Sequence, residues 1–295
     1  MIIVTGGAGK LGARIVDRLL ARVPAERIAV SVRDIGRAGA AAARGVRVRH
    51  GDFGDPASLA AAFEGATQVL VVSADRTGGD AVEHHIAAIE AARGAGAKRV
   101  VYTSHQGAAA DSLFEPMPDH AATERYLAST GTPFTALRNG FYASTVPLLL
   151  GRTLETGELL APADGPVSWT AHADLAEAAA IVLADEGRFD GPTPALVPPH
   201  AFDLADVAEL LGDLTGRTIR RVVVGDAEWA DGLIAHGMPE ARASLLVGMF
   251  RAARRGEFAV TGTDLEDLLG RPATPLRAEL AKIVGSNPAG QRELP

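Results

Sequence analysis

The chain opens with a short apolar run that leads directly into a glycine-rich turn. Residues 2–4 are apolar and predict a buried strand, and residues 5–12 read Thr-Gly-Gly-Ala-Gly-Lys-Leu-Gly. Leu11, Ile15 and Leu19 then follow at the i, i+4, i+8 spacing of an amphipathic helix. Glycines at such a junction let the backbone approach a pyrophosphate, and the helix N-terminus offers unpaired N–H groups. This arrangement predicts a dinucleotide-binding βα unit.

The four glycines of this turn fit two patterns. Gly7, Gly9 and Gly12 match G-x-G-x-x-G, whereas Gly6, Gly9 and Gly12 match G-x-x-G-x-x-G. Either pattern is weak alone, and its place between a strand and a helix makes it specific. The alternative is a strand–turn–helix corner that binds no ligand. We assign the four glycines, together with Lys10 and Leu11, to cofactor binding.

Apolar strands alternate with helices through the first half of the chain. The predicted strands are 2–4, 28–32, 46–48, 69–72, 100–103 and 134–137, and the predicted helices lie near 36–44, 56–64, 80–95 and 117–130. Continuous apolar strands that alternate with helices are typical of a parallel sheet covered on both faces. We therefore expect an α/β fold with a doubly wound, Rossmann-like sheet.

The second half has a different composition. Glycine and proline become frequent after residue 138, and helical patterns remain near 173–185, 203–214, 240–254 and 264–269. We expect a dinucleotide-binding domain over residues 1–156 and a smaller α+β substrate lobe over 157–295. The boundary is approximate, and segments are free to cross between the lobes. Residues 286–295 are predicted to be a frayed tail.

Composition narrows the classes of function. The 295 residues carry a net charge of −7 and no cysteine. This argues against a nucleic-acid partner and excludes disulfides and thiolate metal sites. No apolar run approaches the roughly 20 residues that span a bilayer. We expect a cytoplasmic protein without a membrane partner, and association as a homodimer is left open. We expect no metal site, since the adjacent His84 and His85 point about 100° apart on a helix.

Several segments together resemble the NmrA-like group of atypical short-chain dehydrogenases, and within it the type 2 NAD(P)H:quinone oxidoreductases. The segments are Thr5–Gly12, Val32–Asp34, Gly51–Phe53, Tyr102–Ser104, His120 with Thr123–Glu124, Leu137–Tyr142, Ala173–Ala176 and Leu268–Pro272. The Leu-Arg-Asn-Gly-Phe-Tyr stretch at 137–142 is the most specific. The resemblance implies a Rossmann-like fold, a nicotinamide cofactor and the Gly6-Gly9-Gly12 register.

The end of the second predicted strand bears on cofactor choice. Arg33 occupies the place where an acidic residue would bind a ribose 2′-OH, and an arginine accommodates a 2′-phosphate instead. Arg37 adds charge one helical turn later, whereas Asp34 would repel the phosphate if it turned inward. Alternatively, Arg33 is a solvated strand-end charge. We expect NADP(H) to be preferred, with NAD(H) still able to bind.

Further cofactor contacts are expected where later strands end. The resemblance places Asp52 and Phe53 near the adenine, although Asp52 also suits a turn between glycines. Small residues at the ends of the fourth and fifth strands would let the nicotinamide ribose lie close. These are Ser73, Ala74, Thr103 and Ser104.

The chain lacks the Tyr-x-x-x-Lys pair with which ordinary short-chain dehydrogenases protonate a carbonyl. Residue i+4 is Gln106 after Tyr102, and it is threonine or valine after the other two tyrosines. The resemblance places His120 where the related isoflavone-reductase group has its lysine, so we assign it to catalysis. The alternative is a helix-face histidine paired with Glu124 at i+4.

The absence of a Tyr-x-x-x-Lys pair limits the reactions that the protein is expected to catalyse. Reduction of an isolated ketone builds a basic alkoxide, whereas reduction of a quinone builds a phenolate-like oxygen that needs less acid assistance. Asn139 and Tyr142 are predicted to assist as donors, and Phe141 to stack on a flat acceptor. The same loop also suits a plain turn. Asn139 is additionally assigned to the cofactor, and His105 and Trp169, with Tyr142, to the acceptor, although Trp169 also suits a core position.

The sequence therefore predicts an NAD(P)H-dependent oxidoreductase that passes hydride directly to a quinone-like acceptor without flavin or metal. A non-catalytic, NADP(H)-binding redox sensor is the alternative from another class. Reduction of dyes or other conjugated acceptors is a further alternative.

Overall fold

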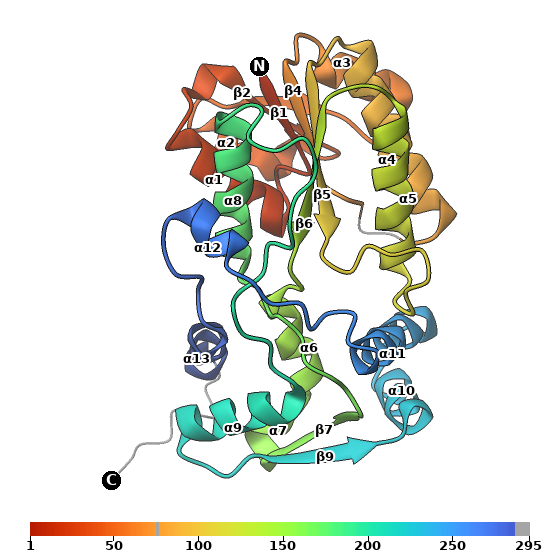
Figure 1. Ribbon diagram of the computed structural model, residues 1–295, viewed down its shortest axis with the longest axis vertical. Coiled ribbons are helices and arrows are strands. Elements are labelled where there is room, and N and C mark those ends of the chain that lie inside the picture. The colour runs from red at the N-terminus through yellow and green to blue at the C-terminus, as the bar shows by residue number, and fades with distance from the viewer. Residues whose placement is uncertain (75–76, 287–295) are drawn as a thin grey trace.

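Seven parallel strands form the main sheet of the computed structural model, which describes residues 1–74 and 77–286 (Figure 1). The strands are β1 (Ile2–Thr5), β2 (Ile28–Val32), β3 (Arg47–His50), β4 (Gln68–Val71), β5 (Arg99–His105), β6 (Phe134–Asn139) and β8 (Gly191–Pro192). Their order is β3-β2-β1-β4-β5-β6-β8, and every pairing is parallel. The expected doubly wound α/β sheet is confirmed. The order reverses between β1 and β4, and ligands bind such sheets beyond the strand ends at that point.

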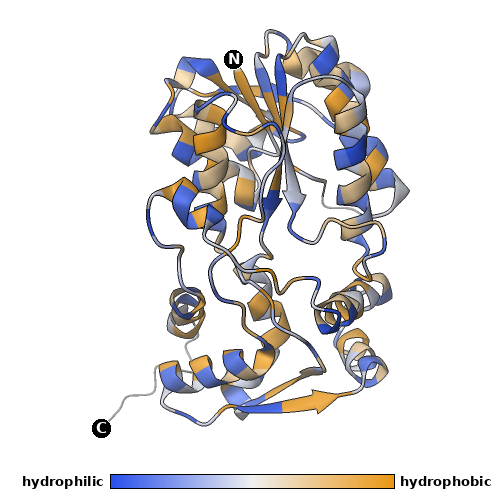
Figure 2. Ribbon diagram, viewed as in Figure 1, coloured by the Kyte–Doolittle hydropathy of each residue, from blue (hydrophilic) through white to orange (hydrophobic). Residues whose placement is uncertain are grey.

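Helices cover both faces of this sheet (Figure 1). One face carries α1 (Lys10–Leu20), α2 (Gly39–Ala42), α8 (His172–Ala184) and α12 (Asp264–Leu269), and the other carries α3 (Pro56–Phe63), α4 (Gly79–Gly94) and α5 (Pro116–Ser129). Ile15 and Leu19 of α1 are fully buried against the first face, and Phe63 and Ile89 against the second. The central strands β1, β2 and β4 are therefore buried and largely apolar, as Figure 2 shows, whereas the edge strand β3 is polar and only partly buried.

A second lobe lies below the carboxyl end of the sheet in Figure 1. It contains the two-stranded parallel sheet β7 (Glu158–Pro162) and β9 (Arg220–Val224), with α6 (Val146–Leu150), α7 (Thr153–Thr156), α9 (Leu204–Thr215), α10 (Asp226–Ala235), α11 (Glu240–Arg254) and α13 (Leu276–Ser286). Its separate apolar core includes Leu211, Trp229 and Phe250. The elements that the sequence patterns missed are β7, β8, β9, α6, α7, α10 and α13. The predicted helix over 36–44 is a 3-10 turn followed by the short α2.

The chain crosses between the lobes more than once. Helix α8 packs against α1, and β8 pairs with β6, although both follow residue 156. The buried Asp174 of α8 accepts hydrogen bonds from Arg271 and from the backbone and hydroxyl of Thr274. The division at residue 156 stays a prediction, and the predicted tail lies beyond the described residues except for the end of α13. No described helix has the length and apolarity to cross a membrane.

Candidate active site at the carboxyl end of the sheet

The turn after β1 is shaped to receive an anion. Gly6 has φ +59°, a conformation that favours glycine, and a Cβ on Gly12 would lie 2.2 Å from the Gly6 carbonyl oxygen. Gly9 is the exposed N-cap of α1, which has neither a side-chain cap nor an acidic residue in its first turn. The first N–H groups of the helix are thus left for an external acceptor.

Four exposed cations surround this turn without a counter-charge. Lys10 and Arg14 lie in the first turns of α1, and Arg33 and Arg37 follow the adjacent β2. Within the described part of the chain, no carboxylate pairs with any of them. The sequence patterns did not single out Arg14, although it lies one helical turn after Lys10. The carboxylate of Asp34 would repel a 2′-phosphate if it turned inward, but it accepts a hydrogen bond from the Gly36 N–H at 2.9 Å.

Other cations on the same face are paired. Arg18 of α1 and Arg22, in the turn after this helix, contact Glu177, and Arg44 contacts Asp17. Among the described cations of residues 10–22 and 33–44, those without a carboxylate partner are therefore the ones next to the glycine turn, which is the distribution that a phosphate-rich ligand requires.

The predicted adenine contacts are mostly engaged within the protein. Asp52 Oδ1 accepts from the Gly54 N–H at 3.0 Å, as a turn residue does, and Phe53 is half-buried with its ring centroid 6.5 Å from that of His84. Their role toward adenine stays a prediction.

Two hydroxyls assigned to the cofactor are also held inside the protein. Thr103 Oγ1 donates to Ser73 Oγ and accepts from the Ser73 N–H, so these two strand ends are tied together. Ser104 Oγ donates to Glu124, which also pairs with Arg138 at 2.7 Å. Glu124 therefore does not pair with His120, contrary to the alternative expected from the sequence. Ala74 contributes its backbone N–H, which donates to His85 Nε2 at 2.9 Å.

Two histidines from different elements lie together where β5 ends. His105 is the last residue of β5, His120 lies on α5, and their stacked rings are 6.2 Å apart. Burial lowers the pKa of His105 to about 3 and holds that of His120 well below its usual range, so both rings are neutral at neutral pH. Gly107 N–H donates to His105 Nδ1 at 3.0 Å, and Tyr102 Oη lies 2.7 Å from His120 Nδ1. No described residue bonds to Nε2 of either ring.

Asn139 ends β6 directly beside His105, its partner in the β5–β6 register. It is 2% exposed, and its Oδ1 has no hydrogen-bond partner. Its side chain bonds to the Tyr142 hydroxyl, which partly offsets the burial that raises the pKa of Tyr142 to about 12. Because a buried amide oxygen rarely lacks a donor, Asn139 presents an open acceptor to this space.

The Tyr142 ring lies against His172, with centroids 4.3 Å apart. His172 is the first residue of α8, and burial lowers its pKa to about 4, with smaller contributions from Arg14 and Lys10. His172 therefore joins the loop after β6 to the cations around the glycine turn. Its place here depends on the packing of α8 on α1, which no local sequence signal shows.

An aromatic cluster closes the floor of the site. Phe141 is 6% exposed and contacts the rings of Phe114, Trp169, Phe258 and His105 at centroid distances of 4.9–5.7 Å. Trp169 is buried, and its Nε1–H donates to a backbone carbonyl. Both rings are thus enclosed by protein, which favours the core alternative for Trp169 and a supporting position for Phe141.

Comparison with known proteins agrees with this geometry. The model of the NmrA-like family matches residues 1–279. The chain belongs to the NmrA-like family. It is 32% identical to quinone oxidoreductase 2 of Escherichia coli over 97% of this chain and 100% of that protein.

Two solved structures with cofactor are also similar to this family member. An NADPH-dependent quinone oxidoreductase of E. coli in complex with NADPH superposes with a TM-score of 0.90, at 31% identity, over 96% of this chain and 99% of that one. A Citrobacter triphenylmethane reductase in complex with NADP(H) superposes with a TM-score of 0.87, at 33% identity and the same two coverages.

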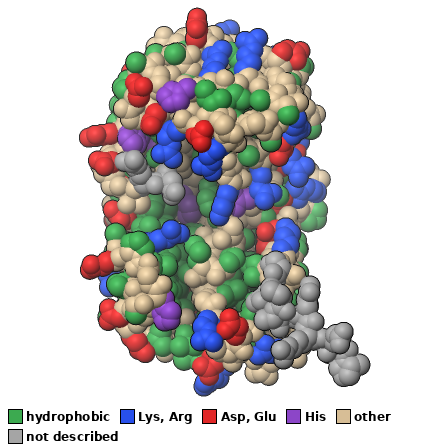
Figure 3. Space-filling view, turned by 180° about the vertical axis from the view of Figure 1, so that it is seen from behind, with side chains coloured by type: hydrophobic (Ala, Val, Ile, Leu, Met, Phe, Trp, Pro, Cys, Tyr) green, Lys and Arg blue, Asp and Glu red, His purple; other side chains and the backbone are tan. Residues whose placement is uncertain are grey.

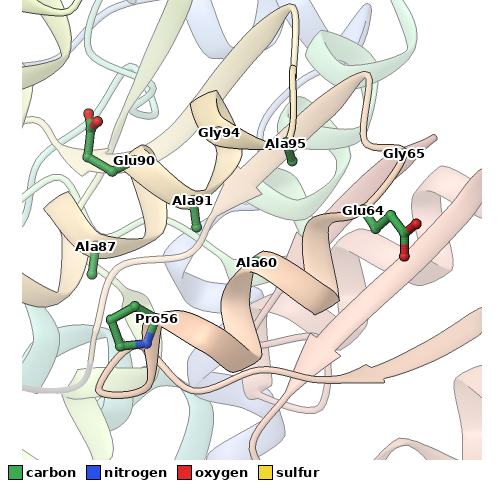
Figure 4. A pocket seen from close by; sticks show the side chains of 9 residues that line it. All are labelled: Pro56, Ala60, Glu64, Gly65, Ala87, Glu90, Ala91, Gly94 and Ala95. Atoms are coloured by element: carbon green, nitrogen blue, oxygen red, sulfur yellow. The ribbon is translucent and has the colours of Figure 1, made fainter.

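The surface between the lobes of this NmrA-like protein is hollowed on the face that Figure 3 shows, with histidines inside the hollow and Lys and Arg side chains around it. A separate depression of about 600 Å³ lies between α3 and α4, lined mainly by alanines, and the side chains of Glu64 and Glu90 at its edge point away from it (Figure 4). It is distant from the strand ends and holds no donor comparable to His105. Over the described residues, no cluster of three or more His, Asp or Glu side chains has metal-binding geometry.

Proposed function

We propose that this protein is an NADPH-dependent reductase that delivers hydride directly to a quinone-like conjugated acceptor, without flavin or metal. The observation that carries the proposal is the pair of neutral histidines, His105 and His120, at the carboxyl end of β5. Neither Nε2 has a partner in the part of the protein that the structure describes. The relatives that reduce quinones and dyes with NADPH or NADP(H) support the same class of reaction.

The residues at the glycine turn fit NADPH. The uncapped first turn of α1 would hold the pyrophosphate, and Arg33 with Arg37 would hold the 2′-phosphate. The open Oδ1 of Asn139 suits the carboxamide N–H of a nicotinamide, since an amide acceptor needs an N–H donor. The expected role of Asn139 as a donor to the acceptor molecule stays a prediction, and one of its two amide N–H groups is already engaged by the Tyr142 hydroxyl.

When bound, NADPH supplies the hydride. His105 and His120 would donate Nε2–H to the acceptor oxygen on which negative charge develops, and the Tyr142 hydroxyl is a third donor nearby. Neutral imidazole can act as an electrophile in this way. A charged histidine here would repel the positive charge of the oxidised nicotinamide. The donors are weak acids, which suits a phenolate-like product oxygen better than an alkoxide.

The proposal is tested by NADPH oxidation with a panel of quinones, triphenylmethane and azo dyes, and isolated ketones. We expect turnover with quinones and little with ketones. Turnover with dyes but not with quinones would identify dyes, and not quinones, as the class of acceptor. Tight NADPH binding without turnover on any acceptor would favour the redox-sensor alternative. Cytoplasmic location and homodimer formation stay predictions.

A further inference from the structure

A buried chain of side chains leads from the end of β4 to His120. Ala74 N–H donates to His85 Nε2 at 2.9 Å, and His85 Nδ1 lies 3.0 Å from Thr123 Oγ1 and 3.3 Å from Tyr102 Oη. Tyr102 Oη in turn lies 2.7 Å from His120 Nδ1. His85 and Tyr102 are 2% and 0% exposed, so water does not compete for these bonds.

The direction of each hydrogen bond follows from its ends. A backbone N–H only donates, so His85 Nε2 is an acceptor and the neutral ring carries its proton on Nδ1. Thr123 Oγ1 uses its own hydrogen on the Asp119 carbonyl at 2.8 Å, and therefore accepts from His85. The same Nδ1–H of His85 faces the Tyr102 hydroxyl at the longer distance of 3.3 Å, as the second acceptor of a shared hydrogen, so Tyr102 directs its own hydrogen to His120 Nδ1.

We propose that Tyr102 and His85 are positioning residues that hold His120 in the Nε2–H form, with this donor turned to the acceptor. The identity of that acceptor rests on the proposed function, whereas the tautomer of His120 follows from the hydrogen bonds alone. Ring orientation and tautomer of a histidine are commonly fixed by the bond at its other nitrogen.

Tyr102 is not itself suited to be a catalytic acid. Its hydroxyl is enclosed between His85 and His120, and its ring is fully buried. Desolvation raises the pKa of Tyr102, so the hydroxyl keeps its hydrogen and stays a donor. Tyr102 thus contacts the histidine that would donate to the acceptor, whereas in ordinary short-chain dehydrogenases a tyrosine is itself the donor.

His105 reaches the same tautomer by a separate route. Its Nδ1 accepts from the Gly107 N–H, which needs no side chain. The two histidines should therefore respond differently when the Tyr102 hydroxyl is removed, and His105 provides an internal reference.

The test is long-range ¹H–¹⁵N NMR of the histidine rings, whose coupling pattern distinguishes Nδ1–H from Nε2–H. Resonances of His120 and His105 are assigned by His120→Gln and His105→Gln. We expect both rings to be in the Nε2–H form in the wild-type protein at neutral pH. An Nδ1–H form at His120 in the wild type would overturn the proposal, even if no variant folds.

Tyr102→Phe should shift His120 toward a mixture of tautomers and leave His105 unchanged. It should also lower kcat with a quinone by on the order of threefold to tenfold and leave the Kd for NADPH unchanged. Tyr126→Phe is the matched control, because that hydroxyl bonds to Glu90 on the surface. It should change none of these quantities.

The outcomes separate this inference from the proposed function. If both histidines have the expected tautomers but quinones are not reduced, the positioning role of Tyr102 and His85 is supported and the quinone-like acceptor is ruled out. If quinones are reduced but Tyr102→Phe does not change the tautomer of His120, the reductase function is supported and the positioning role of Tyr102 and His85 is overturned.

Discussion

Gly107 N–H donates to Nδ1 of His105 at 3.0 Å, and this single bond places the proton of the neutral ring on Nε2. The donor is a backbone group two residues along the same chain, so it is insensitive to changes elsewhere in the site. His105 also lies beside Asn139 in the β5–β6 register. The relationship makes His105 the donor whose removal is easiest to interpret.

His105→Phe keeps a flat ring among Phe141 and Phe258 but removes both ring nitrogens. We expect kcat/KM with a quinone to fall on the order of tenfold to a hundredfold, because a hydrogen bond to developing charge is lost. NADPH affinity, measured by calorimetry, should stay the same. His236→Phe, at an exposed position, is the control. Full turnover in a folded His105→Phe protein would remove His105 from the reaction.

Arg33→Ala should weaken NADPH binding by on the order of tenfold to a hundredfold and leave NADH binding unchanged. Arg33 has no partner among residues 1–74 and 77–286, so the substitution breaks no ion pair within them. Arg44→Ala is the matched control, because Arg44 is on the same face but pairs with Asp17. Equal losses for the two cofactors would show that Arg33 does not read the 2′-phosphate.

Stability should fall on mild acidification because of His85 and His105. Burial lowers the pKa of His85 to about 4 and that of His105 to about 3, whereas in the unfolded chain both titrate near 6.5. Below about pH 6.5 the unfolded state binds more protons than the folded state. The contribution of these histidines to the free energy of unfolding is therefore fully present above that pH and is lost as the pH falls toward their folded-state pKa values. At about pH 5.5 the two together should cost roughly 2–3 kcal/mol.

Denaturant unfolding across this pH range measures the decline. His105→Phe removes one of these two histidines and should reduce their joint contribution to the slope of unfolding free energy against pH by about half. His120 and His172, whose pKa values burial also lowers, continue to contribute to the slope in this variant. A slope that is unaffected by the substitution would mean that His105 is not held neutral by burial.

Local patterns predicted the elements that lie before the site. The glycine turn, the six main strands and helices such as α11 are recognisable because each depends on neighbours within a few residues. Among the elements missed, β9 reads Arg-Arg-Val-Val-Val, and its β-branched run is a strand signal.

The inside of the site was predicted less well, for a physical reason. Tyr102 is excluded as an acid by its missing lysine, but its contacts with His85 and His120 depend on how α4 and α5 pack on β5. Phe258 reaches the ring of Phe141 from the far end of the chain. Such contacts arise from tertiary packing, which residue spacing does not encode.

Asn139→Ala supplies the sharpest test of where the nicotinamide lies. The buried Oδ1 of Asn139 is unpartnered, and we expect it to accept from the carboxamide. Its loss should weaken NADPH binding by roughly threefold to tenfold, as for one neutral hydrogen bond, and should lower kcat as well. Affinity for 2′,5′-ADP should not change, because that fragment lacks the nicotinamide.

The fragment comparison also separates a local effect from a general one. Gly140 next to Asn139 is required by packing, since a Cβ there would lie 2.0 Å from Thr170 Oγ1, so the loop has structural reasons of its own. Parallel loss of NADPH and 2′,5′-ADP binding would indicate that Asn139→Ala disturbs this loop and the fold around it. Unchanged NADPH affinity in a folded variant would return Asn139 to a turn residue. The acceptor would then have to be placed from His105 and His120 alone.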